Sequence, residues 1–510
     1  MIKKIIFFSD YVDGMQKFNK TGATLRLAYM LRKQGYEVRQ IHHAMSFTSE
    51  ELTQIIDNFS KGDPIVACIS TSFLGSLNRK NRYFIKGSEY DPEICDTGFY
   101  WGGQTFRFLL TLGNILKQKQ IPTLMGGWKV VEKTFAWPGM SNAWGWDVLA
   151  NFVNYFIIGS SIDPIVRFCN SEELENKTYG KAKVVYGPEV TDFTDCASTP
   201  LPEDCINQNE ALITEVAAGC IFSCSFCDYK VLGKKKNEYV RTYDSLKREI
   251  VSNYDNFKTR FYILTDNIIN DFDEKLHYLI RIREETGIDL RWSAYGRLDT
   301  MAKKDSIQLL VDSGCAGLVF GIESMKKEVG QYIGKMTDKN KLIDRMKLFR
   351  DVVGDTILVN GSFIAGLPTE TKDDLYKTYE WLQSDEGRYY IDSYTFTSLF
   401  IHDHNDEKNE INKARNNPFR DYVKVSQSRW ISPWGTFEEF SDLAHQFNLK
   451  RTNYISGFLI QDMHNLGVEV EDVVSIIRKN NDGIKKHILE PVYSRTKQKI
   501  DEYKKKVLAL

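Results

Sequence analysis

The stretch AGCIFSCSFC, residues 218–227, carries three cysteines at the spacing Cys-x3-Cys-x2-Cys and comes directly after an apolar run at residues 211–216. Three thiolates on one short loop can hold three corners of an iron–sulfur cube, and the fourth corner then lacks a nearby cysteine. An iron with an open coordination position can bind and activate a small molecule. The spacing therefore favours a cluster site with one open iron.

Two simpler interpretations of these cysteines stay open at this point. They could form a structural zinc site, or they could be three unrelated buried side chains. Zinc sites usually show paired Cys-x2-Cys or Cys/His ligands in two halves, and the sequence has no evident second half. Short cysteine motifs also arise by chance.

The same stretch resembles the signature of the radical S-adenosylmethionine (SAM) enzymes, in which an aromatic residue, here Phe226, precedes the third cysteine. The resemblance implies that Cys220, Cys224 and Cys227 bind a [4Fe-4S] cluster whose fourth iron is chelated by the amino and carboxylate groups of SAM. It also implies that an electron from the cluster cleaves SAM to methionine and a 5′-deoxyadenosyl radical, with Phe226 beside the adenine.

Length and composition are typical of a soluble globular protein. The chain has 510 residues, enough for about two to four domains. The formal net charge is −1, which gives no electrostatic argument for a nucleic-acid partner. Nine cysteines are few and odd in number for this length, so we expect the reducing cytoplasm rather than a disulfide scaffold. The sequence contains no run of about 18 apolar residues, so we expect no membrane span.

Residues 1–170 alternate short apolar strands with helical segments, which predicts a doubly wound, Rossmann-like parallel sheet with an insertion at residues 76–103. Such a sheet binds ligands at the carboxyl ends of its strands, and Gly126-Gly127 stands at one of them. A Gly-Gly pair after a strand is more often a tight turn. Residues 171–210, rich in Glu, Asp, Asn, Thr and Pro, look like a linker.

The N-terminal pattern resembles the cobalamin-binding domain of one large class of radical SAM enzymes. The resemblance implies that Ser70, Gly126 and Gly127 bind cobalamin. Many such domains carry Asp-x-His-x-x-Gly in the first loop, with the His as the lower cobalt ligand, but residues 9–22 contain no His. His42 and His43 follow the second predicted strand and are interpreted as ordinary loop residues. A vestigial domain that only shapes the pocket is the alternative.

Residues 211–404 contain six strand–helix units, which predict a partial (β/α)6 TIM-like barrel. In such barrels the active site is formed by polar residues at the carboxyl ends of the strands. One polar residue after a strand usually caps a helix. Several such residues on the same face as the cysteine loop favour an active site. The polar residues at these ends are Asp266, Arg297, Glu323 and His402.

Two barrel segments, residues 314–324 and 364–371, are similar to the fourth-strand and fifth-strand segments of the radical SAM family. The resemblance implies that Arg297 and Glu323 reach the polar parts of SAM and that Ile364 and Gly366 line the adenine.

The family's usual Glu, three residues past that Gly, is Thr369 here with Glu370 beside it, so this role is not transferred. Cys315 lies inside the fourth-strand segment and is expected in the core.

Residues 405–510 read as a mainly helical C-terminal domain or cap, with a charged, mobile loop at residues 403–417. Trp430 and Trp434 either close a pocket or pack the helices. The sequence contains no recognisable RNA-binding module, which argues against the tRNA-thiolating relatives.

The resemblance thus implies a radical SAM enzyme, with cobalamin-dependent methylation of an unactivated substrate carbon as the favoured reaction. A non-methylating cyclase or rearrangement enzyme with a vestigial cobalamin domain is one alternative, and a non-catalytic Fe–S electron-transfer protein is another. The expected partners are a small-molecule or peptide substrate and a flavodoxin- or ferredoxin-type electron donor. The sequence singles out no catalytic acid, base or radical-quenching residue.

Overall fold

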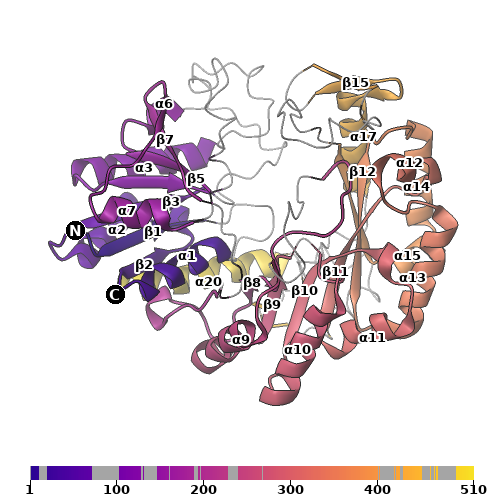
Figure 1. The fold of residues 1–510 in the computed structure, drawn as a ribbon, viewed down its shortest axis with the longest axis horizontal. Helices are drawn as coiled ribbons and strands as arrows, with labels where there is room; N and C mark the ends of the chain where they lie inside the picture. Colours follow the sequence, from indigo (N-terminus) through magenta and orange to yellow (C-terminus); the bar gives the residue numbers. More distant parts are fainter. Residues whose placement is uncertain are drawn as a thin grey trace. The chain divides into compact units, whose positions relative to one another are not determined.

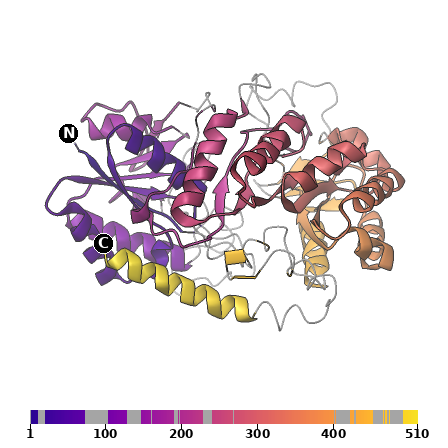
Figure 2. The same ribbon diagram turned by 90° about the horizontal axis from the view of Figure 1, so that it is seen from below.

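The computed structural model divides the chain into two compact units, shown as ribbons in Figures 1 and 2. The first unit comprises Met1–Ile213, Asp244–Thr259 and Tyr493–Leu510, and the second comprises Thr214–Tyr243 and Arg260–Val492. The structure describes residues 2–10, 20–71, 103–127, 130, 146–159, 161–188, 193, 195, 197–227, 239–266, 268–399, 401, 419, 421–425, 429–450, 460, 464–465, 467–468, 472 and 490–510. His402 and the predicted loop at 403–417 lie outside these ranges, as does nearly all of the predicted insertion at 76–103.

The first unit is built on a seven-stranded sheet with the strand order β2-β1-β3-β4-β5-β7-β6. All its pairs are parallel except that of β6 with β7. The strands are β1 (Lys4–Phe8), β2 (Glu37–Ile41), β3 (Ile65–Ser70), β4 (Thr123–Gly126), β5 (Tyr155–Ile158), β6 (Lys177–Tyr179) and β7 (Ala182–Tyr186).

Helices cover both faces of this sheet. The helices of the unit are α1 (Gly22–Lys33), α2 (Ser49–Ser60), α3 (Gly103–Gln118), α6 (Trp146–Leu149), α7 (Asp163–Cys169), α9 (Tyr243–Phe257) and α20 (Glu490–Leu508), with short 3-10 turns at Ala44–Ser46 and Pro202–Asp204. Ile6 and Phe8 of β1 join a core cluster with α2 and α3. Ile5 and Phe7 point the other way and join a second cluster with α1 and α7. This confirms the doubly wound fold predicted from the sequence.

Two segments of the first unit differ from the sequence-based expectation. Residues 177–186, expected in a linker, form β6 and β7 of the sheet. Helix α20 (yellow in Figure 2) was expected in a C-terminal cap but packs in the first unit. Its Tyr503 is fully buried, and the Tyr503 hydroxyl accepts a hydrogen bond from the backbone N–H of His42 at 2.9 Å. The domain boundaries at 170, 210 and 404 stay predictions.

His42 and His43 lie in a loop, but the interpretation of them as ordinary loop residues is wrong. Both rings are buried, and His42 Nδ1 hydrogen-bonds to Ser9 Oγ at 3.1 Å. Burial, with the charge of Lys20, holds the pKa of His42 well below its usual value. The sequence pattern missed this because the covering residue, Tyr503, lies far away in the chain.

The second unit contains a six-stranded sheet in the order β13-β12-β11-β10-β9-β8, and the pairs from β9 to β13 are parallel. Its strands are β8 (Leu212–Thr214), β9 (Phe261–Leu264), β10 (Arg291–Gly296), β11 (Cys315–Glu323), β12 (Leu358–Ala365) and β13 (Ser393–Ser398). In chain order, α9 lies between β8 and β9, and the later helices are α10 (Asp273–Thr286), α11 (Lys304–Asp312), α12 (Lys327–Ile333), α13 (Lys339–Val353), α14 (Lys372–Gln383) and α15 (Asp385–Tyr390). This is the predicted partial (β/α)6 barrel (Figure 1).

The free edge of β13 is covered by α17 (Phe437–Lys450). The side-chain amide of Asn448 accepts a hydrogen bond from the backbone N–H of Phe396 at 2.9 Å and donates one to its carbonyl at 2.7 Å. The amide thus replaces a neighbouring strand and removes an exposed sheet edge.

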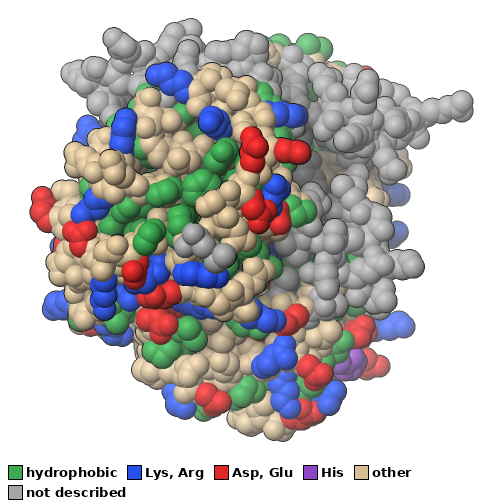
Figure 3. Space-filling view, turned by 60° about the vertical axis from the view of Figure 1, so that its left-hand side comes forward, with side chains coloured by type: hydrophobic (Ala, Val, Ile, Leu, Met, Phe, Trp, Pro, Cys, Tyr) green, Lys and Arg blue, Asp and Glu red, His purple; other side chains and the backbone are tan. Residues whose placement is uncertain are grey.

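A small antiparallel sheet that the sequence did not predict lies before α17. Its strands are β14 (Val423–Lys424), β15 (Trp430–Ser432) and β16 (Gly435–Thr436). Trp430 is fully buried against Phe437 and Phe440, so of the two options for this residue the structure supports packing. None of the described helices is both long and apolar enough to cross a membrane. On the face in Figure 3, basic and acidic side chains are interspersed.

Candidate active site

The predicted site residues of the second unit lie at the carboxyl ends of its strands. Arg297 follows β10, Glu323 ends β11, and the segment from Ile364 to Gly366 spans the end of β12. The loop with Cys220, Cys224 and Cys227 follows β8. The alternation of strands and helices explains this arrangement, because all carboxyl ends of a parallel barrel meet at one edge.

Asp266, which follows β9, anchors the start of the cysteine loop. Its Oδ2 accepts a hydrogen bond from the backbone N–H of Val216 at 2.8 Å. Lys275 Nζ lies 3.5 Å from Asp266 Oδ1 and 2.6 Å from Asp271 Oδ1, and all three side chains are fully buried. Asp266 is therefore bound by groups of the protein itself and acts as a structural anchor.

A second set of contacts fixes the same segment from the other side. Ala217 forms a β-bridge with Val240, and the N–H of Ala218 donates to the carbonyl of Tyr239 at 2.9 Å. The buried guanidinium of Arg241 donates to Thr214 Oγ1 at 3.2 Å. Residues 214–218 are thus held on two sides before the first cysteine.

The cysteine loop itself is tied to the end of α12. Ser225 donates from its N–H to the carbonyl of Ile333 at 3.2 Å and from its hydroxyl to the carbonyl of Tyr332 at 2.9 Å. Gly219 has a φ of 103°, which favours glycine. Cys224 is buried, whereas Cys220 and Cys227 are half-buried.

The three thiols lie on one short loop and are the groups that would hold a cluster. Among the residues that the structure describes, no three His, Cys, Asp or Glu side chains are grouped as ligands of one ion would be. A cluster binds its thiolates on different irons, so they need not converge on one point. Burial raises the pKa of Cys220, and the nearby Cys224 and Asp271 also raise it.

Arg297 faces the cysteine loop. Its Nη1 lies 3.4 Å from Cys224 Sγ, and its guanidinium stacks 3.9 Å from the ring centre of Phe222. Nε and Nη2 donate to the two carboxylate oxygens of Asp299 at 2.8 and 2.5 Å. The expected contact of Arg297 with SAM stays a prediction.

Glu323 pairs with a residue that the sequence reasoning missed, Lys335, whose Nζ lies 2.9 Å from Glu323 Oε1. Both side chains are almost fully buried. A Cβ on Gly321 would lie 2.4 Å from Glu323 Oε1, so glycine makes room for this pair. Burial alone would raise the pKa of Asp299, but Arg297 and Lys335 hold that pKa below its usual value. Positive and negative groups thus alternate across the ends of β10 and β11.

The predicted adenine-lining residues lie beside aromatic packing. Gly366 has a φ of 91°, and a Cβ there would lie 2.5 Å from Trp430. The Tyr422 hydroxyl donates to the Gly366 carbonyl at 2.8 Å. Ile364 is half-buried, and so is Phe226 in the cysteine loop. Their role toward adenine stays a prediction.

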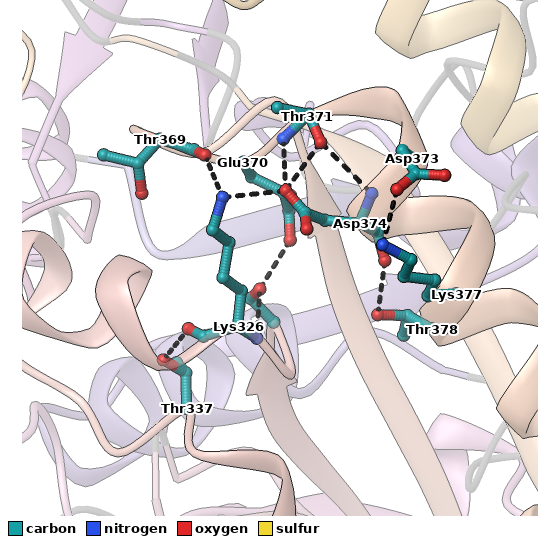
Figure 4. A network of polar contacts seen from close by, with 10 residues as sticks. Lys326, Thr337, Thr369, Glu370, Thr371, Asp373, Asp374, Lys377 and Thr378 are labelled. Atoms are coloured by element: carbon teal, nitrogen blue, oxygen red, sulfur yellow. Dashed lines mark hydrogen bonds and ion pairs between the residues drawn. The ribbon is translucent and has the colours of Figure 1, made fainter.

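A polar network joins the ends of β11 and β12 (Figure 4). Ser324 Oγ donates to Glu370 Oε1 at 2.5 Å, and Lys326 Nζ donates to the Thr369 carbonyl at 2.6 Å and to Asp374 Oδ2 at 2.8 Å. The sequence did not reveal these links because the partners lie more than 40 residues apart. Glu370, to which no role was transferred, is buried here.

Thr369 is strained in this network, and we expect Thr369→Gly to stabilise the protein. Its φ is 69°, a left-handed conformation that costs a residue with a Cβ about 1–2 kcal/mol. The gain exceeds the extra chain entropy of glycine, so the free energy of unfolding should rise by about 1 kcal/mol. Thr371→Ala, which removes the N-cap of α14, should instead lose about 1 kcal/mol in the same denaturant titration. A loss of stability in Thr369→Gly would contradict the strain.

Glu370 should make stability pH-dependent. Burial raises its pKa to about 8, with Asp374 also raising it, while Ser324 and backbone N–H groups oppose the shift. Between its usual value of 4.5 and about 8, the folded state keeps a proton that the unfolded state releases, so this contribution to stability falls as pH rises. Glu370→Gln should flatten the fall between pH 5.5 and 8 in denaturant unfolding, whereas Glu380→Gln, at an exposed position of α14, should not. Equal slopes for wild type and Glu370→Gln would show that Glu370 is ionised throughout.

A cysteine loop after the first strand of a six-stranded β/α barrel defines the class of radical SAM domains. Residues 214–382 match the sequence model of the Radical SAM superfamily. A radical SAM domain implies a [4Fe-4S] cluster and SAM as cofactors.

Among curated proteins, the chain is 26% identical over 174 residues to an uncharacterized methyltransferase of Pyrococcus horikoshii and 24% identical over 174 residues to a bacteriochlorophyllide d C-12(1)-methyltransferase of Chlorobaculum tepidum. Each match covers 33% of this chain and 36% of the relative. The similarity therefore spans about a third of these relatives' length.

Solved structures share the fold over much more of the chain. The radical SAM methyltransferase TsrM of Kitasatospora setae, with tryptophan and a SAM analogue bound, is 14% identical with a TM-score of 0.54 and covers 78% of this chain and 73% of its own. The cobalamin-dependent SAM radical enzyme OxsB, with aqua-cobalamin bound, is 12% identical with a TM-score of 0.54 and covers 100% of this chain and 81% of its own. The chain thus shares the fold of TsrM and OxsB.

Proposed function

We propose that this protein is a cobalamin-dependent radical SAM enzyme that methylates an unactivated carbon of its substrate. One observation carries the proposal: a doubly wound sheet in the order β2-β1-β3-β4-β5 and a β/α barrel with a three-cysteine loop occur in one chain. The fold likeness to TsrM and OxsB, which spans both units, and the two methyltransferase relatives support it. The tryptophan in TsrM is that protein's substrate, and we assign no particular substrate here.

In the second unit, Cys220, Cys224 and Cys227 would hold the cluster. When bound, the cluster and SAM supply the electron and the 5′-deoxyadenosyl radical that removes a hydrogen from a substrate carbon, and cobalamin supplies the methyl group. The buried Glu323–Lys335 pair offers one negative and one positive group for the amino and carboxylate groups of SAM.

In the first unit, the ends of β3 and β4 offer an open backbone for cobalamin. Ser70 pairs with Gly126, and the N–H of Thr71 donates to the Gly126 carbonyl at 2.7 Å. Gly127 has a φ of 108°, a backbone conformation that residues with a Cβ rarely adopt. Gly126 has no such need, and a Cβ there would make only ordinary contacts, at 3.4 Å or more. Among the residues that the structure describes, neither packing nor strain explains glycine at 126, and close approach of a ligand is the explanation that we propose.

The proposal is tested by anaerobic reconstitution with iron, sulfide and hydroxocobalamin, followed by metal analysis. We expect about one cobalt per wild-type chain and much less in Gly126→Val, whose added side chain fills the ligand's space, while both proteins hold the same iron. With SAM carrying a deuterated methyl group, mass spectrometry should detect the label in a product once a substrate is supplied. Iron and 5′-deoxyadenosine without cobalt would instead support the non-methylating alternative.

The partners follow from this chemistry. The cluster needs a one-electron donor, for which we propose a flavodoxin- or ferredoxin-type protein, and the substrate would be a small molecule or a peptide. An oxygen-sensitive cluster suits the reducing cytoplasm, which we propose as the location.

A further inference from the structure

The guanidinium of Arg297 is held in place from several directions. Its side chain is 8% exposed, and Asp299 binds Nε and Nη2 through both carboxylate oxygens. The backbone of Arg297 is fixed as well, because Asn270 accepts its N–H and donates to its carbonyl, each at 2.8 Å. A forked ion pair of this kind restricts the orientation of the whole side chain.

The remaining nitrogen, Nη1, is directed at the cysteine loop. It lies 3.4 Å from Cys224 Sγ, a hydrogen-bonding distance for sulfur. Phe222, between the first two cysteines, supports the guanidinium from one side, with the cation 3.9 Å from the ring centre. Arg297 therefore contacts two residues of the loop that would hold the cluster.

This arrangement has an electrostatic consequence for a metal cluster. Hydrogen bonds to the sulfurs of an iron–sulfur cluster and the charge around it set its reduction potential. Reduction adds one negative charge, and a cation beside a ligand sulfur favours the more negative form. Asp299 offsets part of the charge of Arg297, but Nη1 is directed at the sulfur, and because both side chains are almost wholly buried, solvent screens the interaction weakly.

We propose that Arg297 is a positioning residue for the cluster: it donates a hydrogen bond to the Cys224 sulfur and raises the reduction potential, while Asp299 and Phe222 hold it there. This role rests on the proposed function, because it needs a cluster on the cysteines. It differs from the role that family resemblance implies for Arg297, which is contact with SAM.

The test compares wild type with Arg297→Gln and with Arg281→Gln, which removes the same charge from an exposed site on α10. After anaerobic reconstitution with iron and sulfide, each protein is titrated with dithionite in the presence of redox mediators, and the reduced cluster is followed by EPR. Equilibrium dialysis gives the Kd for SAM. We expect Arg297→Gln to hold iron with a more negative midpoint potential, and Arg281→Gln to match wild type.

An unchanged potential in Arg297→Gln, with a Kd for SAM raised about tenfold, would overturn the proposal and restore the SAM-binding role. If Arg297→Gln holds no iron, Arg297→Lys decides: it keeps the charge but cannot span Asp299 and Cys224 together. A more negative potential in Arg297→Lys supports the proposal, because the hydrogen bond to the sulfur is lost although the charge stays, and a wild-type potential contradicts the hydrogen bond that the proposal requires. Absence of iron from wild type would overturn the proposed function itself, a separate result.

Discussion

Replacing Cys224 by alanine should abolish cluster loading and lower 5′-deoxyadenosine formation by more than about 100-fold. Changes around a metal ligand already cost about 10–100-fold, and loss of the ligand itself costs more. Cys224 is also the buried member of the three and the one that Arg297 contacts. The measurement is iron per chain with 5′-deoxyadenosine after addition of SAM and a reductant.

Cys315→Ala is the matched control for this prediction. Cys315 lies buried in β11, and burial raises the pKa of its thiol, as is typical of an inert core cysteine. The variant should keep its iron and its 5′-deoxyadenosine formation. Equal iron in Cys224→Ala and Cys315→Ala would show that the cysteine loop does not hold the cluster.

Replacing Lys275 by methionine should destabilise the protein by about 3–5 kcal/mol, the cost of leaving a buried charge without its partner. Lys275, Asp266 and Asp271 are fully buried, and Lys275 is the cation that lies between the two carboxylates. Without it, two buried carboxylates remain next to each other, one of them bound to the start of the cysteine loop. The free energy of unfolding in urea measures the loss.

Lys347→Met on α13 is the control, because Lys347 is exposed and such changes usually stay within about 0.5 kcal/mol. Adding Asp271→Asn to Lys275→Met should recover part of the lost stability, since it removes one of the two unpaired charges. Wild-type stability in Lys275→Met would contradict the anchoring role of this network.

The fold could be predicted where local periodicity determines structure. Short apolar runs alternating with amphipathic segments correctly indicated β1 to β5 and the six units of the barrel. Helix α20 was placed wrongly in a cap, because its amphipathic pattern does not say which surface it covers. Only its packing in the first unit, with Tyr503 buried beside His42, shows that.

The candidate site could be predicted for residues that carry a motif or end a strand. Cys224, Arg297 and Glu323 were named in this way; the structure places them at or after the ends of β8, β10 and β11, and their roles stay predictions. Lys335 and Glu370 were not, because their importance comes from pairing with Glu323 and Ser324, residues 12 and 46 positions away. Such pairings leave no periodic or motif signal in the sequence.

The central claim is that the cysteine loop holds a cluster which binds and cleaves SAM. The most direct measurement is the EPR spectrum of the anaerobically reconstituted, reduced protein with and without SAM, with 5′-deoxyadenosine quantified in the same sample. We expect SAM to change the spectrum, because it binds the open iron, and 5′-deoxyadenosine to form. A cluster whose spectrum SAM leaves unchanged, with no 5′-deoxyadenosine, would contradict the account and indicate an electron-transfer protein.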